Sequence, residues 1–272
     1  MKIMALGDPH GSQKIYQVDL SKADLVLIPG DIGRADELRK YYREYYLTGK
    51  VTLSREEVIE AYKRSIDSAK SILLYVSSNS PQTFLVTGNA DEFKKGAQRH
   101  GWSFPTLGEI CRDFPNVKVI DYQYVNHGGL RIAGLPNHFD FSRISRHLLP
   151  RMDSLIEEAE REKRRAVDFL DTIREKPVDI LLSHDPPFCG EYKGKNPGLK
   201  VDMIDSRMSL GNHHDRHAGS LIIREYLLSS ESWPKTLVCG HIHEGKGIYE
   251  VSGVEIINCG SEGEFVEFEL PC

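Results

Sequence analysis

The segment Ile3-Met4-Ala5-Leu6-Gly7-Asp8-Pro9-His10-Gly11 joins an apolar run directly to a turn that carries an acid and an imidazole. The run from Ile3 to Leu6 predicts a buried strand, and the turn residues after it predict where the strand ends. Asp8 and His10 are two residues apart, so at an extended strand end both side chains leave on the same face. An oxygen donor and an imidazole make half of a metal site. Taken alone, the segment is equally an Asx turn beside an unrelated histidine.

The same arrangement, an apolar strand followed by a polar side chain, recurs four more times. The apolar runs cover residues 24–29, 83–87, 178–183 and 236–239. Ligands bind at the carboxyl ends of strands in open α/β sheets, so we expect the polar residues there to converge. These residues are Asp8, His10, Asp31, Asn89, His184, His241 and His243.

Length, charge and cysteine usage restrict the class of protein. The chain has 272 residues, of which 40% are hydrophobic and 28% charged, as in globular proteins. The net charge of −5 gives no general basic footprint and disfavours a nucleic-acid partner. The five cysteines form no C-x-x-C pair and indicate reduced thiols in the cytoplasm. We expect no signal peptide and no membrane span, because no apolar run approaches about 20 residues.

Residues 36–78 interrupt the succession of strands with helical periodicity. Ser54 and Glu57 form a capping box, and two helices joined near Gly49 are expected. The first helix is rich in tyrosine. It is interpreted as a cap over the site, as the face of a homodimer, or as a helix packed on the sheet.

The rest of the chain predicts further strands and helices without a linker or internal repeat. Residues 117–124 and 130–134 predict two strands with a turn at 126–129. Helices are expected at 151–175 and 221–228, and the tail predicts strands at 247–251, 254–258 and 264–270. The simplest interpretation is a single domain over residues 1–272 with a helical insertion near 36–78.

The polar residues at the strand ends combine two carboxylates, four imidazoles and one amide. This mixture suits Mn, Fe, Zn or Ni and is too rich in nitrogen for a dedicated calcium or magnesium site. Seven ligands are too many for one catalytic ion with an open position, but they suit two ions that share a carboxylate. Two ions about 3.5–4 Å apart serve in-line displacement at phosphorus, where they deprotonate the attacking water and offset phosphoryl charge.

In order, the five motifs resemble those of the calcineurin-like metallophosphoesterase superfamily: D-x-H, G-D, G-N, a lone histidine and G-H-x-H. The resemblance implies a four-layer α-β-β-α sandwich of two mixed sheets. It implies that one metal is held by Asp8, His10, Asp31 and His243, and the other by Asp31, Asn89, His184 and His241. Asp31 would bridge the ions, and Asp31 and Asn89 would also be catalytic. The implied reaction is attack of a metal-bound hydroxide on a small phosphate ester, with manganese the favoured metal.

One motif departs from the family pattern. Ala90 stands where the third motif usually carries a histidine, and alanine cannot transfer a proton. His217, with His213 and His214 as alternatives, could replace the missing catalytic group; otherwise the substrate has a good leaving group, or activity is low. The departure favours a phosphodiesterase of the smaller bacterial and archaeal type over a protein phosphatase.

Two other hypotheses remain open. A metal-binding interaction scaffold on the same fold, as in a retromer subunit, is the alternative to an enzyme. The acidic charge disfavours a nuclease of the double-strand-break-repair type. Arg34, just beyond Asp31, is either a phosphate clamp or a solvated side chain.

Overall fold

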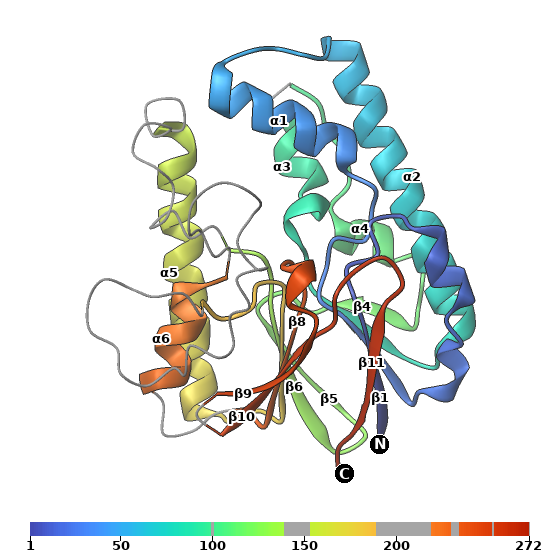
Figure 1. Cartoon of the computed structure of the whole chain (residues 1–272), viewed down its shortest axis with the longest axis vertical. Coiled ribbons are helices and arrows are strands. Elements are labelled where there is room, and N and C mark those ends of the chain that lie inside the picture. Colours follow the sequence, from blue (N-terminus) through green and yellow to red (C-terminus); the bar gives the residue numbers. More distant parts are fainter. Residues whose placement is uncertain (99–100, 139–152, 189–218, 230–233, 252, 272) are drawn as a thin grey trace.

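The computed structural model describes residues 1–98, 101–138, 153–188, 219–229, 234–251 and 253–271 (Figure 1). Two sheets form its centre. In the first sheet, four strands are parallel and the fifth, at one edge, is antiparallel to its neighbour. Its spatial order is β11 (Phe265–Glu269), β1 (Lys2–Leu6), β2 (Leu25–Ile28), β3 (Thr83–Leu85) and β4 (Val117–Val119).

The second sheet has four parallel strands between two antiparallel edges. Because the inner strands are parallel, their carboxyl ends meet at one edge of the sheet. The spatial order is β5 (Gln123–His127), β6 (Leu130–Leu135), β7 (Ile180–Ser183), β8 (Thr236–Cys239), β10 (Val254–Asn258) and β9 (Gly247–Val251).

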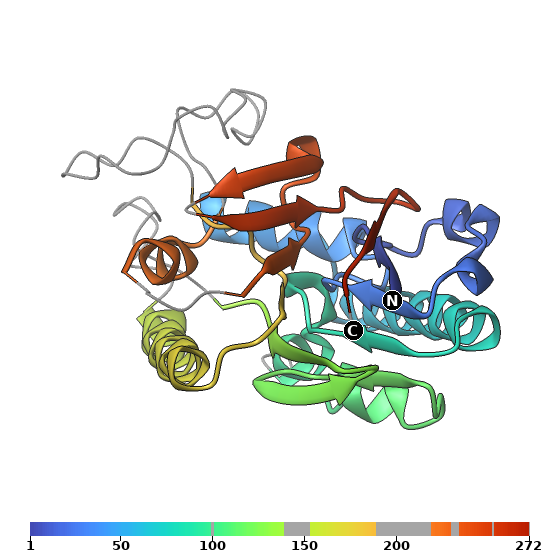
Figure 2. The same ribbon diagram turned by 90° about the horizontal axis from the view of Figure 1, so that it is seen from below.

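Alternate residues of the inner strands face opposite layers. Ile3 and Ala5 of β1 pack with Ile180 and Leu182 of β7 in a core between the two sheets. Met4 and Leu6 instead pack outward against the helices of the first sheet. Strands buried on both faces explain why these runs are continuously apolar. The predicted four-layer sandwich of two mixed sheets is confirmed, and Figure 2 shows the sheets between the helices.

Helices cover the outer face of each sheet. On the second sheet they are α5 (Asp153–Glu175) and α6 (Leu221–Ser229). On the first sheet they are α1 (Asp36–Thr48), α2 (Arg55–Asn79), α3 (Phe93–Gln98) and α4 (Leu107–Cys111). Short 3₁₀ turns occur at η1 (Gln13–Gln17), η2 (Leu20–Lys22), η3 (Asn89–Asp91) and η8 (His243–Gly245). None of the helices within the described ranges combines the length and apolar composition needed to cross a membrane.

The predicted helix pair at 36–78 is confirmed as α1 and α2. Gly49 ends α1 with a φ of 72°, a conformation in which glycine avoids steric strain. The capping box starts α2: the Glu57 amide donates to the Ser54 hydroxyl at 3.2 Å, and the Ser54 amide donates to the Glu57 carboxylate at 2.7 Å. Leu38 and Tyr41 of α1 are buried in the same core as α2, so α1 packs on the fold. Figure 1 shows α1 across the top of the molecule.

The prediction of one strand over 117–124 is wrong. This segment forms β4 and the start of β5, which belong to different sheets. The Ile120 amide donates to Leu85 in the first sheet, whereas the Tyr122 amide donates to Gly134 in the second. Tyr122 has a φ of 52°, which breaks the extended conformation where the chain changes sheet. The turn expected at 126–129 is present, with positive φ at Gly128 and Gly129 as a type I′ hairpin requires.

Candidate metal centre

The seven side chains at the strand ends come together where the two sheets meet. Asp8 and His10 follow β1, Asp31 follows β2, and Asn89 follows β3, all in the first sheet. The second sheet contributes His184 after β7 and the pair His241 and His243 after β8. The site therefore lies across both sheets, at the carboxyl ends of their parallel strands.

Three of these residues have left-handed backbone conformations. The φ angles are 47° at His10, 53° at Asp31 and 62° at His241. Such conformations are uncommon for residues other than glycine and cost roughly 1–3 kcal/mol each. The chain is also tightly packed here, since a Cβ at Gly240 would lie 1.9 Å from Asp8 Oδ1. The turns therefore require glycine before His241 and hold the side chains in fixed directions.

Asp8, His10 and His243 form the first ligand cluster, with one potential ligand atom from each within 4.8 Å of the others. The Nε2 atoms of His10 and His243 are 3.1 Å apart, and His243 Nε2 is 3.3 Å from Asp8 Oδ2. Asp8 Oδ2 also accepts a hydrogen bond from the His241 amide at 2.7 Å, whereas the buried Asp8 Oδ1 has no partner. An unpartnered buried carboxylate oxygen is costly unless a cation or donor satisfies it.

A second ligand cluster joins Asp8 to Asp31 and His184, again within 4.8 Å. His184 Nε2 is 3.0 Å from Asn89 Oδ1 and 3.2 Å from His241 Nδ1. His184 Nδ1 donates to the Pro29 carbonyl at 2.9 Å, which directs Nε2 into the site, where a metal ion would displace its proton. Several acceptor atoms thus converge on one small volume, and this donor set fits a divalent cation.

Asp31 belongs to the second cluster and also lies near His10 of the first. Its Oδ2 is 3.7 Å from His10 Nε2, and its Oδ1 is 3.7 Å from His184 Nε2. Burial alone would raise the pKa of the Asp31 carboxyl, but the charges of His184, His10 and Arg39 outweigh burial and hold the pKa well below its usual range. Asp31 is therefore ionised, as a ligand must be.

The histidines divide by environment. Burial lowers the pKa of His10 and His241 and favours the neutral imidazole. Burial would also lower the pKa of His184, but the carboxylates of Asp31, Asp8 and Asp185 raise it to about 9. The three carboxylates around His184 thus stabilise a positive charge, and the same electrostatic environment favours the binding of a cation.

Two outer carboxylates hold this arrangement. Asp91 accepts hydrogen bonds from the Ile32 amide at 2.9 Å and the Gly88 amide at 3.0 Å, and so joins the turns after β2 and β3. Burial and the charge of Asp31 raise the pKa of Asp91 to about 7. Asp185 Oδ1 lies 3.9 Å from His241 Nε2. Sequence reasoning missed Asp185, although it directly follows His184.

His138, which follows β6, is buried. Its Nε2 is 2.6 Å from the Ser220 hydroxyl, and its Nδ1 is 3.6 Å from Asp185 Oδ2. His138 therefore supports Asp185 from behind and connects it to the start of α6.

The profile of the calcineurin-like phosphoesterase family matches residues 1–245. The chain belongs to this family. A solved crystal structure is 18% identical with a TM-score of 0.58, covering 98% of this chain and 93% of its own, and supports the fold. A protein of unknown function from Aquifex aeolicus is 13% identical with a TM-score of 0.32, covering 74% and 84%. No curated protein matches the chain.

Membership of the calcineurin-like phosphoesterase family and the two ligand clusters together support the general assignment of this chain as a metallophosphoesterase. Within this family, the chain departs from the usual pattern at Ala90. The Ala90 amide donates to Asp31 Oδ1 at 2.6 Å, so the backbone at this position orients Asp31 while the side chain has no proton to transfer. His217, His213 and His214 lie outside the described residues, and a role for His217 stays a prediction.

An arginine reaches the site, but it is not the one considered from the sequence. Arg34 pairs with Asp36 at 3.2 Å and its side chain is 71% exposed. Arg39 of α1 instead donates from Nη2 to Asp31 Oδ2 at 2.6 Å and lies 3.4 Å from His10 Nε2. Sequence reasoning missed Arg39 because it belongs to no motif; its place one turn into a helix after the Asp31 turn was the available signal.

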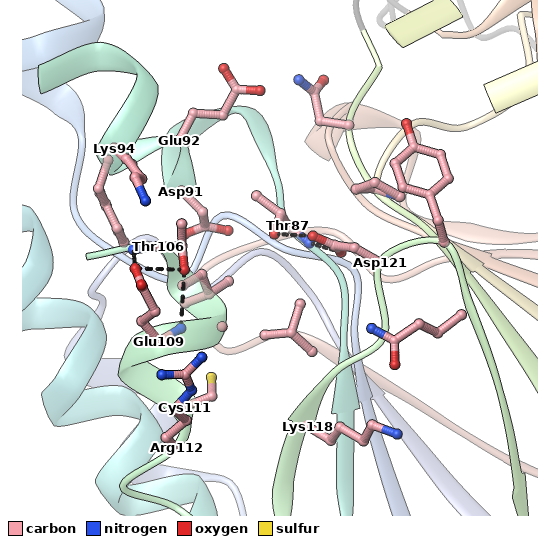
Figure 3. A pocket seen from close by; sticks show the side chains of 18 of the residues that line it. Thr87, Asp91, Glu92, Lys94, Thr106, Glu109, Cys111, Arg112, Lys118 and Asp121 are labelled. Carbon is pink, nitrogen blue, oxygen red and sulfur yellow. Dashed lines mark hydrogen bonds between the residues drawn. The ribbon is translucent and has the colours of Figure 1, made fainter. Parts of the chain in front are cut away.

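A cavity of about 640 Å³ lies beside β4 and β5, where the chain changes sheet, and borders the metal centre at Asp91 (Figure 3). Several of its polar groups are paired with one another, whereas the buried Asn137 Nδ2 has no partner. The amide and hydroxyl of Thr87 donate to the Asp121 carboxylate at 2.9 and 2.5 Å. The Tyr122 hydroxyl is 3.3 Å from the Glu162 carboxylate, and the Arg165 guanidinium lies 4.0 Å from the Tyr122 ring centroid. Among the residues that the structure describes, both groups of converging ligand atoms lie at the metal centre and not in this cavity.

Proposed function

We propose that this chain is a phosphodiesterase that hydrolyses a small phosphate ester with two divalent transition-metal ions, manganese being the native pair. The observation that carries the proposal is the two ligand clusters that share Asp8, with an unpartnered buried oxygen and facing ring nitrogens. Asp8, His10, Asp31 and His243 would hold one ion, and Asp31, Asn89, His184 and His241 the other. When bound, such ions make an attacking water more acidic and offset charge on the phosphoryl oxygens.

Other groups of the chain orient the side chains that would bind the ions. The Ala90 amide holds Asp31 Oδ1 in place. The Pro29 carbonyl fixes the tautomer of His184, and Asp185 lies beside the outer nitrogen of His241. Outer partners of this kind raise the affinity of a metal site and fix the direction of its ligands.

Ala90 supports a diester as the substrate. No side chain at this position protonates the leaving oxygen, so a substrate whose leaving group departs as an anion is favoured. A diester also carries one negative charge where a monoester carries two. It therefore needs less stabilisation from the side chain that is missing here.

A metal-reconstitution assay tests the proposal. The purified protein is stripped with a chelator and titrated with Mn²⁺, Fe²⁺, Ni²⁺ or Zn²⁺, and bound metal is counted by mass spectrometry. Bis(p-nitrophenyl) phosphate and p-nitrophenyl phosphate serve as the diester and monoester. We expect two ions per chain, highest activity with Mn²⁺, and faster hydrolysis of the diester. Activity that persists after complete removal of metal would contradict the proposal.

The interaction scaffold is a second candidate, and Ala90 is the observation that favours it. The scaffold predicts bound metal without hydrolysis of either ester. Seven potential ligands drawn together favour the enzyme, because an interaction surface does not need two complete sets of ligands.

A cytoplasmic location is part of the proposal. Among the described cysteines, Cys111 and Cys259 are buried free thiols, which supports a reducing compartment. Fractionation of the source cells with an antibody against the chain would test this location.

A further inference from the structure

Arg39 brings a permanent positive charge to the most buried carboxylate of the site. Its Nη2 is 2.6 Å from Asp31 Oδ2, whose side chain is fully buried, while the Arg39 side chain is itself 40% exposed. The guanidinium therefore lies on the side of Asp31 that faces solvent. It also lies 3.4 Å from His10 Nε2, so it is next to two of the proposed ligand atoms.

The backbone that carries Arg39 is well anchored, whereas its side chain is long and only partly covered. Leu38 and Tyr41 on either side of it are buried in the core shared with α2. Glu37 of α1 also pairs with Arg64 of α2. A cation held by Asp31 and His10 would repel the guanidinium. Because α1 is anchored, the guanidinium would nevertheless remain near the solvent-facing side of Asp31, where an anionic ligand must enter.

We infer that Arg39 contacts the phosphoryl oxygens of the substrate and supplies the positive charge, though not the proton, that a histidine at position 90 would supply. This inference rests on the proposed phosphoesterase function. A guanidinium suits the task because its planar N–H groups match two phosphoryl oxygens at once. The helical insertion thus contributes directly to the reaction.

The chemistry of arginine gives this inference a distinctive consequence. Arginine stays protonated at all working pH values, so it offsets charge but cannot donate a proton to the leaving oxygen. The rate should therefore depend steeply on the pKa of the leaving group. Removal of Arg39 should slow all substrates by a similar factor and leave that dependence unchanged.

Binding of inorganic phosphate to the Mn²⁺-loaded protein provides the first test. Isothermal titration calorimetry compares the wild type with Arg39→Ala, Arg39→Lys and the matched control Arg34→Ala. We expect all four proteins to bind Mn²⁺ with the same stoichiometry. Phosphate affinity should fall about 10- to 100-fold in Arg39→Ala, recover in part in Arg39→Lys, and stay unchanged in Arg34→Ala. Unchanged phosphate affinity in Arg39→Ala, or loss of Mn²⁺ from it, would overturn the inference.

Kinetics with aryl phosphodiesters of increasing leaving-group pKa provide the second test. Arg39→Ala should reduce kcat/KM in parallel across the series, and Ala90→His should restore rates for the poorest leaving groups. A steeper leaving-group dependence in Arg39→Ala would overturn the inference. If the wild type hydrolyses no ester but binds phosphate through Arg39, the proposed function fails and the contact stands. If the wild type is active and Arg39→Ala is equally active, the contact fails alone.

Discussion

The candidate metal centre and the cavity beside β4 and β5 both contain buried carboxylates but differ in how these carboxylates are paired. In the cavity, Asp121 accepts two hydrogen bonds from Thr87, and Tyr122 lies between Glu162 and Arg165. At the metal centre, ring nitrogens face each other and Asp8 Oδ1 has no partner. The volume of a cavity therefore does not by itself indicate the candidate functional site. Unpaired ligand atoms that converge on one point are the better indicator.

Backbone strain alone does not separate the two regions. Tyr122 beside the cavity has a φ of 52°, close to the 53° of Asp31. At Tyr122 the left-handed residue lets the chain pass from one sheet to the other. At Asp31 it directs a carboxylate toward two histidines, so the same conformation serves connectivity in one place and chemistry in the other.

Removal of a ligand at the metal centre should have the largest effect. His184→Ala deletes a nitrogen shared by the contacts to Asn89 and His241, and Asp31→Asn removes the negative charge that lies near both His10 and His184. Each should reduce kcat/KM by more than about 100-fold, because even outer partners of metal ligands contribute 10- to 100-fold. His127→Ala, a histidine outside the site, is the control. Near wild-type activity in His184→Ala or Asp31→Asn would remove the basis for the comparison.

Loss of an outer carboxylate should have an intermediate effect. Asp185→Asn keeps the size of the side chain but removes the charge 3.9 Å from His241 Nε2. We expect metal affinity and kcat/KM to fall about 10- to 100-fold. Asp171→Asn on the surface of α5 is the matched control. If the two variants have equal metal affinity in a calorimetric titration, Asp185 has no role in orienting His241.

Replacement of Asp121 in the cavity should affect stability rather than catalysis. Burial raises the pKa of Asp121 above 3.8, partly offset by the bonds from Thr87, so the folded state binds this proton more tightly than the unfolded chain. The free energy of unfolding therefore falls as pH rises from about 3.8 through the folded-state pKa. The fall amounts to about 1.4 kcal/mol for each pH unit that separates the pKa of the folded state from that of the unfolded chain. Asp121→Asn lacks this titration.

Urea denaturation of both proteins between pH 4 and pH 8 measures the effect. The unfolding free energy of the wild type relative to Asp121→Asn should decrease with rising pH, while kcat/KM stays within about twofold. A difference that does not vary with pH would show that the two carboxylate environments are more alike than their hydrogen bonds indicate.

Most of the fold could be predicted from the sequence because its strands are apolar throughout and end in distinct turns. The run at 236–239 matches β8, and the capping box at Ser54 marks the start of α2. The change of sheet at residues 120–122 could not be predicted, because the deciding hydrogen bonds go to Leu85 and Gly134, which are remote in sequence. The same applies to Arg39 and Asp185, whose importance depends on neighbours brought close by folding.

The two-sheet origin of the site has a mechanical consequence. Asp8, His10, Asp31 and Asn89 extend from one sheet, and His184, His241 and His243 from the other, with the apolar layer of Ile3, Ile180 and Leu182 setting the separation. A cation bound by residues of both sheets would link the sheets, since they could not separate without breaking its coordination. Substitutions in that apolar layer would in turn change the distances between the ligands of the two sheets. Affinity for the ion and the stability of the packing between the two sheets are therefore thermodynamically linked.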